Sequence, residues 1–156
     1  MKKVLVFGGI VILLFGLLAV VNSMKQSQLA EGNPFGKERI APATAELMND
    51  PNYQNVILPD ELEEILEDNG DVTVYFYSST CPYCKEATPR LVPISEELGV
   101  DLVQYNLTEF EDGYSDYRIE STPTLIHYED GEEVNRIVGS APDDEYRAFF
   151  EEHVNN

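Results

Sequence analysis

The stretch Val72–Arg90, VTVYFYSSTCPYCKEATPR, contains both cysteines of the chain, Cys81 and Cys84. Val72–Tyr77 is a nearly continuous apolar run, which predicts a buried strand. Lys85–Leu98, after the cysteines, has the pattern of a helix. A strand, a tight turn and a Cys-x-x-Cys at the start of a helix together favour redox chemistry of the two thiols.

The spacing of the cysteines suits thiol–disulfide exchange. Residues i and i+3 lie on one side of the first helical turn, so two thiols there can form a disulfide with little backbone movement. We expect Cys81 at the N-cap, where free backbone N–H groups and the helix dipole favour the reactive thiolate. We expect Cys84 to be more buried and to act as the resolving thiol. Pro82 suits the first helical position, where its missing N–H needs no partner.

Two other roles for the cysteine pair have less support. A structural disulfide across so short a loop would add little stability. A zinc site would need more ligands, but the only histidines, His127 and His153, are far apart in sequence and no third cysteine exists. We therefore expect no metal and no cofactor other than the Cys81–Cys84 disulfide.

The N-terminal region carries an uncharged apolar segment, Val4–Val21, after Lys2 and Lys3. As a helix, its eighteen residues would span about 27 Å, close to the bilayer core of about 30 Å. Two interpretations stay open, a retained signal-anchor and a signal peptide cleaved after Ser23. The length favours the anchor. The lysines predict that residues 1–3 are cytoplasmic, in a single-pass protein of the cell membrane with an extracytoplasmic C-terminal domain.

The remainder of the chain is strongly acidic. Without Lys2 and Lys3 it has 8 basic and 29 acidic residues, a net charge of −21. This charge argues against nucleic-acid partners and is typical of a solvated surface. Residues 22–52, with several Asn-Pro, Ala-Pro and Asp-Pro turn signals, are interpreted as a linker, and residues 53–156 as the domain.

The order of predicted elements indicates an α/β fold. Strands are expected at Asn55–Leu58, Val72–Tyr77, Leu102–Leu107, Thr124–Tyr128 and Glu133–Val138, and helices from Pro59, after the cysteines, at Glu111–Tyr117 and at Asp143–Val154. The first strands and helices favour a parallel crossover, and Glu129-Asp130-Gly131 predicts a hairpin turn. We predict a central mixed sheet of four to five strands flanked by helices.

Further motifs follow the cysteines in a fixed order: Pro89, then Thr122-Pro123-Thr124, then Gly131 and Gly139. They resemble the kink proline, the cis-proline loop and the hairpin and groove glycines of the thioredoxin family, over about Asn55–Val154. Together with TCPYC and the apolar N-terminal segment, they are also similar to bacterial extracytoplasmic thioredoxin-like proteins, including those called bacteriocin transport accessory proteins. The predicted fold class is therefore thioredoxin-like.

The resemblance implies a role for each matched residue. Cys81 would be the attacking thiol and Cys84 the resolving one, and the dipeptide Pro82-Tyr83 would tune the redox poise. A cis Thr122–Pro123 bond would let Thr122 offer its backbone to an extended substrate peptide. Gly139 would leave room for that peptide beside the cysteines.

The sequence departs from the family pattern at three positions. Thr80 occupies the place of a tryptophan, Tyr75 that of a buried acid and Gln104 that of the lysine paired with it. In the family that acid is thought to assist proton transfer at the resolving cysteine, so its replacement argues against efficient general reduction. Pro-Tyr between the cysteines is more typical of glutaredoxins, but the glutathione-binding Gly-Gly is missing.

These features predict a membrane-tethered extracytoplasmic thiol–disulfide oxidoreductase. Its partners would be cysteine-containing exported proteins or peptides, and a membrane or extracytoplasmic redox protein that recycles the disulfide. The competing hypothesis is a non-catalytic client-binding or export accessory module that holds a peptide in the Pro123 groove. Residue types do not decide whether the pair oxidises, reduces or isomerises, because 30 mV corresponds to only about 1.4 kcal/mol.

Overall fold

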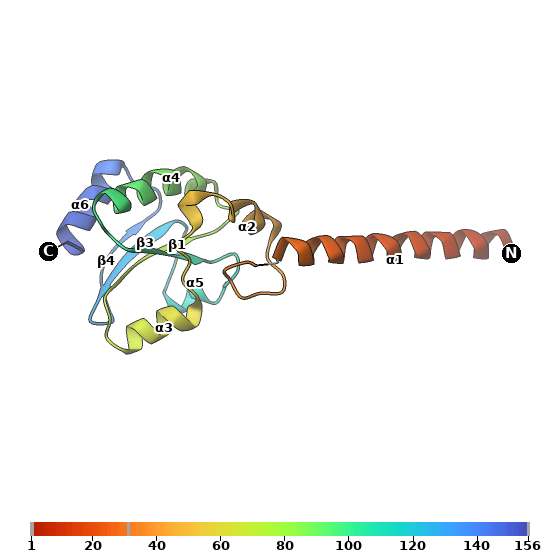
Figure 1. Cartoon of the computed structure of the whole chain (residues 1–156), viewed down its shortest axis with the longest axis horizontal. Coiled ribbons are helices and arrows are strands. Elements are labelled where there is room, and N and C mark those ends of the chain that lie inside the picture. The colour runs from red at the N-terminus through yellow and green to blue at the C-terminus, as the bar shows by residue number, and fades with distance from the viewer. Residues whose placement is uncertain (1, 31, 156) are drawn as a thin grey trace.

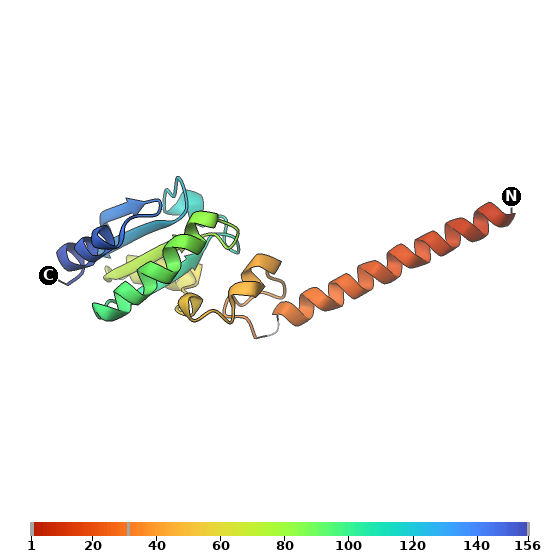
Figure 2. The same cartoon turned by 90° about the horizontal axis from the view of Figure 1, so that it is seen from above.

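A long N-terminal helix and a folded domain make up the computed structural model, which describes residues 2–30 and 32–155 (Figures 1 and 2). The helix, α1 (Lys2–Ala30), extends away from the domain in both views. Within it, Phe7–Met24 has a mean hydropathy of 2.3 and is not buried by the rest of the chain. By length and composition α1 is therefore a candidate membrane span, and it overlaps the segment predicted at residues 4–21.

The domain contains a mixed sheet with helices on both sides. In chain order its elements are α2 (Pro42–Leu47), the 3-10 helix η1 (Pro51–Tyr53), α3 (Pro59–Glu67), β1 (Val72–Tyr77), α4 (Pro82–Glu97), β2 (Leu102–Asn106), α5 (Gly113–Asp116), β3 (Thr124–Glu129), β4 (Glu132–Val138) and α6 (Asp143–His153). The strand order is β2-β1-β3-β4. β1 is parallel to β2 and antiparallel to β3, and β3 and β4 form the predicted hairpin.

The predicted first strand, Asn55–Leu58, is wrong. This segment forms only an isolated parallel bridge between Val56 and Gln104. Gln104 N–H donates to the Asn55 carbonyl at 2.7 Å, and Ile57 N–H donates to the Gln104 carbonyl at 3.1 Å. Helix α3 then begins at Pro59, which has no N–H with which to continue a ladder. Within residues 33–155 the sheet therefore has four strands.

The sheet separates two apolar clusters, because successive side chains of a strand point to opposite faces. On one face Tyr75, Tyr77 and Leu125 pack with residues of α4 and α6, among them Leu91 and Phe150. The other face packs with α3 through a second cluster, which contains Val74, Phe76, Ile126 and Leu62. All six side chains of β1 are buried, as expected for a central strand. The end of β1 is therefore a rigid base for the cysteine motif.

Part of the predicted linker packs against the domain. Phe35 and Ile40 are only 5% and 4% exposed, and they cluster with Phe110, which follows β2. The Phe35 and Phe110 rings are 6.2 Å apart. We call residues 33–47 the strap. They follow the short connection after α1, end with α2, and pack against the domain beside Phe110. The boundary predicted at residue 53 itself stays a prediction.

Candidate redox site

The cysteine motif lies where β1 gives way to α4. Cys81 is the N-cap of α4, with φ −76° and ψ 121°, and Pro82 occupies the first helical position. The Cys84 backbone N–H donates to Cys81 Sγ at 3.4 Å. The helix thus begins where the sequence predicts, and its first turn presents a free N–H to the Cys81 sulfur.

The two thiols are free and lie in different environments. Cys84 is fully buried, and burial raises the pKa of its thiol to about 12. Cys81 is partly exposed. Burial raises the pKa of Cys81, but hydrogen bonds from the Thr122 side chain and from the backbone of Cys84 and Tyr83 outweigh this effect and lower the pKa overall. At neutral pH a larger fraction of Cys81 than of Cys84 is therefore thiolate, the form that attacks in thiol–disulfide exchange.

The loop before β3 brings Thr122 beside Cys81, and Gly139, the residue after β4, is hydrogen-bonded to the neighbouring Pro123. The Thr122–Pro123 bond is cis, as the family resemblance implied. The Thr122 carbonyl lies 3.3 Å from Cys81 Sγ, and the Gly139 N–H donates to the Pro123 carbonyl at 2.7 Å. Gly139 has φ +91°, which favours glycine, and no described atom lies within 4 Å of where a Cβ would stand. The place that the resemblance assigned to a substrate peptide is therefore open.

Two tyrosines at the rim of this site present aromatic surface to solvent. Tyr83, between the cysteines, is 62% exposed, and Tyr114 in α5 is 37% exposed. Burial raises the pKa of Tyr114, while a hydrogen bond with the Thr122 side chain lowers it. No motif in the sequence marks Tyr114, because its place beside the cis-proline loop depends on the packing of α5.

Neutral side chains, Tyr75 and Gln104, occupy the two positions where the family has an acid and a lysine. The Tyr75 and Thr88 hydroxyl oxygens are 3.0 Å apart, and Thr88 Oγ1 donates to the Cys84 carbonyl at 2.7 Å. Burial raises the pKa of Tyr75 far above its ordinary value. Gln104, the partner of Tyr75 in the β1–β2 register, donates to the Asn52 carbonyl at 2.8 Å, and its Oε1 has no hydrogen-bond partner among the described residues. Neither position supplies a charged group to Cys84.

The strap is hydrogen-bonded to the turn that precedes Cys81. Thr44 Oγ1 and Ser79 Oγ are 2.9 Å apart, and both are buried. Asn106, at the end of β2, donates to Ser79 Oγ at 3.0 Å. Ser79 N–H donates in turn to Thr108 Oγ1 at 2.8 Å. Residues from the predicted linker therefore help to fix the turn that precedes Cys81.

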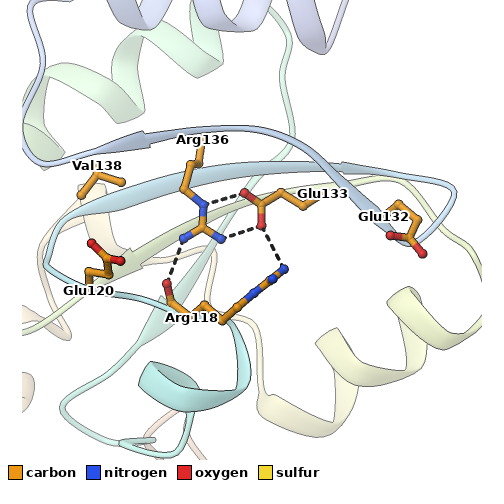
Figure 3. Close-up of a pocket in the computed structure, with 6 residues that line it drawn as sticks. All are labelled: Arg118, Glu120, Glu132, Glu133, Arg136 and Val138. Atoms are coloured by element: carbon orange, nitrogen blue, oxygen red, sulfur yellow. Dashed lines mark hydrogen bonds and ion pairs between the residues drawn. The ribbon is translucent and has the colours of Figure 1, made fainter.

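Arg136 on β4 holds the start of the cis-proline loop (Figure 3). Its Nε and Nη2 atoms each lie 2.5 Å from a carboxylate oxygen of Glu133, in a bidentate ion pair. It also donates to the carbonyls of Arg118, at 2.9 Å, and Tyr117, at 3.3 Å. Since this loop continues to Thr122, the Arg136 contacts support the position of Thr122 beside Cys81.

The sheet topology, the paired thiols and the cis-proline loop together define a thioredoxin-type domain. The sequence model of the family described as Thioredoxin matches residues 53–152, and the chain belongs to the thioredoxin family. This is a family of thiol–disulfide oxidoreductases, and the family resemblance and the predicted fold class are confirmed. The narrower similarity to bacteriocin transport accessory proteins stays a prediction.

Individual relatives agree with the family match. The chain is 32% identical over 93 residues to Thioredoxin C-2 of Corynebacterium nephridii, covering 58% of this chain and 86% of that protein. The crystal structure of thioredoxin from Aeropyrum pernix is similar with a TM-score of 0.51 and 30% identity, covering 62% of this chain and 83% of that one. A structure of a mutant thioredoxin from Halobacterium salinarum gives a TM-score of 0.56 and 25% identity, with 66% and 92% coverage.

Proposed function

We propose that this protein is a membrane-tethered, extracytoplasmic thiol–disulfide oxidoreductase that acts through Cys81 and Cys84. The observation that carries the proposal is the pairing of a partly exposed Cys81 thiol of lowered pKa with a buried Cys84 thiol of raised pKa. The tether is supported by α1, whose apolar segment is long enough to cross a bilayer and follows two lysines. The clients are cysteine-containing exported proteins or peptides.

The proposed reaction is a two-step exchange through a mixed disulfide at Cys81. In the reducing direction the Cys81 thiolate attacks one sulfur of a client disulfide, and the other client sulfur leaves as a thiolate and takes a proton. Cys84 then loses its proton and attacks Cys81 Sγ, which releases the second client thiol. Two electrons pass to the client, and the Cys81–Cys84 pair becomes a disulfide. In the oxidising direction the same steps run in reverse, with Cys81 as the sulfur attacked by the client.

The residues around the pair have proposed roles in this exchange. Thr122 offers its backbone to an extended client segment beside Pro123, and the open space at Gly139 accommodates that segment. The Pro82-Tyr83 dipeptide, with its exposed ring, forms the other side of the contact. A second redox protein, in the membrane or outside it, recycles the cysteine pair.

The test is the reduction potential of the Cys81–Cys84 pair, measured by equilibration with glutathione buffers. A value near that of thioredoxin, about −270 mV, assigns the protein as a reductant, and a value near about −120 mV assigns it as a disulfide donor. A Cys84→Ser variant should accumulate a mixed disulfide with a cystine-containing peptide. A pair that resists both reduction and exchange would refute the catalytic proposal. Client maturation that survives in the Cys81→Ser/Cys84→Ser variant would favour the binding module.

A further inference from the structure

The strap contacts the same edge of the sheet that carries Cys81. β1 and β2 are parallel, so the residues that follow them, Ser79 and Glu109, lie at one edge. Strap residues bond to both: Thr44 to Ser79, and Ala41 N–H to Glu109 Oε1 at 2.9 Å. Lys37 also pairs with Glu109 and lies over the Phe110 ring, 4.5 Å from its centroid. The chain therefore enters the domain at its catalytic edge.

The connection from α1 to the strap is short. Three peptide bonds separate Ala30 from Asn33, and they reach at most about 11 Å. Helix α1 continues for six residues past Met24, the end of its apolar window, which adds about 9 Å. The strap therefore begins within about 20 Å of the end of the apolar segment. A free linker over residues 22–52 would instead have a root-mean-square span of about 30 Å and no preferred direction.

The opposite edge of the sheet lies away from this connection. Residue Glu132, at the β3–β4 hairpin, is near the start of β1, while Cys81 follows its end. The six residues of β1 separate these edges by about 20 Å. Figure 1 shows the same arrangement, with the hairpin on the side of the domain opposite α1.

We propose that the strap holds Cys81 toward the bilayer surface, and that the redox partner is a membrane protein whose disulfide or dithiol lies at its extracytoplasmic face. This inference rests on the proposed anchoring and exchange chemistry. The edge that faces the bilayer also carries Tyr83, whose exposed aromatic ring suits an apolar contact next to a thiol. A partner embedded in the same bilayer reaches this edge by lateral diffusion, whereas a folded soluble client must enter the narrow space between domain and lipid.

The exchange with such a partner needs no further reagent. The Cys81 thiolate attacks one sulfur of the partner disulfide, and Cys84 then attacks Cys81 Sγ. The partner gains two electrons and leaves with two thiols, which carry the protons that Cys81 and Cys84 lose. If the partner starts as a dithiol and this chain as a disulfide, the same bonds form and break in the reverse order.

The orientation is tested by fluorescence quenching of the full chain in phosphatidylcholine nanodiscs that contain a headgroup-labelled acceptor lipid. One variant, Cys84→Ser, carries the dye on Cys81. The matched control, Cys81→Ser/Cys84→Ser/Glu132→Cys, carries it at the hairpin edge. Quenching should be stronger at Cys81, and a Gly-Ser spacer of about 20 residues between Gly32 and Asn33 should remove the difference. Equal quenching at both edges of the chain without the spacer would overturn the proposed orientation.

The partner class is tested with one cystine peptide in two forms, anchored to lipid in the same discs or free in solution. At equal total concentration the anchored form should exchange at least tenfold faster, and the spacer should reduce this ratio several-fold. A free peptide that reacts as fast as the anchored one would overturn the inference and leave the oxidoreductase proposal intact. Failure of both peptides to exchange would refute the proposed chemistry and this inference with it. A chain that does not remain with the discs would refute the anchoring on which it rests.

Discussion

The two thiols of the site differ in burial and in pKa, and this difference predicts how fast each is alkylated. The experiment uses two single-thiol variants, Cys84→Ser, which keeps Cys81, and Cys81→Ser, which keeps Cys84. Only the thiolate reacts with iodoacetamide, so the rate at a given pH follows the thiolate fraction and the access of the reagent. Both variants are compared in the native state, with the urea-unfolded chains as the reference.

The size of the effect follows from the two pKa values. A pKa of about 12 leaves about 10⁻⁵ of Cys84 as thiolate at pH 7. The pKa of Cys81 is lowered, and an ordinary cysteine with a pKa of about 8.5 already has about 3% thiolate at pH 7. Cys81 should therefore react more than about 10³-fold faster than Cys84, and the full burial of Cys84 slows access further.

The assay is mass spectrometry of the alkylated chains between pH 6 and about pH 10. The Cys81 rate should rise with pH and then level off at a lower pH than in the urea-unfolded chain, whereas the Cys84 rate should still rise about tenfold per unit at the top of the range. In urea the two thiols should react at similar rates. If Cys84 in the folded Cys81→Ser variant reacts within tenfold of Cys81 at pH 7, the assignment of nucleophile and resolving thiol is refuted.

Three further variants test the contacts around the site. Arg136→Ala should lower the free energy of unfolding by about 1–3 kcal/mol in urea titrations, because two loop carbonyls lose their donor. It should also raise the pKa of Cys81, because the same loop positions the Thr122 side chain whose hydrogen bond lowers that pKa. Arg147→Ala, in an exposed ion pair, should do neither. Phe35→Ala should release the strap and lower the free energy of its local opening, measured by amide exchange, by up to the 3–5 kcal/mol typical of a buried Phe→Ala change. Unchanged exchange rates in the strap would contradict the packing role of Phe35. Tyr75→Phe should cost about 1 kcal/mol, because one buried bond to Thr88 is lost; a neutral effect on urea unfolding would contradict that bond.

The sheet and the cysteine geometry were predictable because local signals specify them. The apolar run of β1 indicates a central strand, and the cysteine spacing with Pro82 indicates the first turn of α4. Asn55–Leu58 carries strand-type residues too, but it lies between η1 and the proline that begins α3. Whether such a short segment joins the sheet depends on its neighbours, which periodicity does not describe.

The docking of the strap was not predictable from its own residues. Phe35 and Ile40 stand among polar and turn-forming residues, with no helical or strand period. Their burial comes from Phe110, which lies about seventy residues away in sequence. The contacts of Thr44 and Thr88 with the site were missed for the same reason, since each hydroxyl finds its partner only after the helices pack.

The neutral residues at the family's acid and lysine positions lead to a last prediction, about the step that resolves the mixed disulfide. For this step Cys84 must lose a proton, and burial is the main cause of its raised pKa. Cys81 contributes less to this raised pKa, so the pKa of Cys84 should remain high when Cys81 is joined to a client. Tyr75 and Gln104 do not accept that proton as a buried carboxylate would. Resolution should therefore be the slow step and should speed up about tenfold per pH unit from pH 7 to 9, as followed by stopped-flow release of a fluorescent client thiol. A rate that stays flat over this range would show that another group takes the proton from Cys84. The replacement of the family's acid and lysine by Tyr75 and Gln104 would then not limit proton transfer.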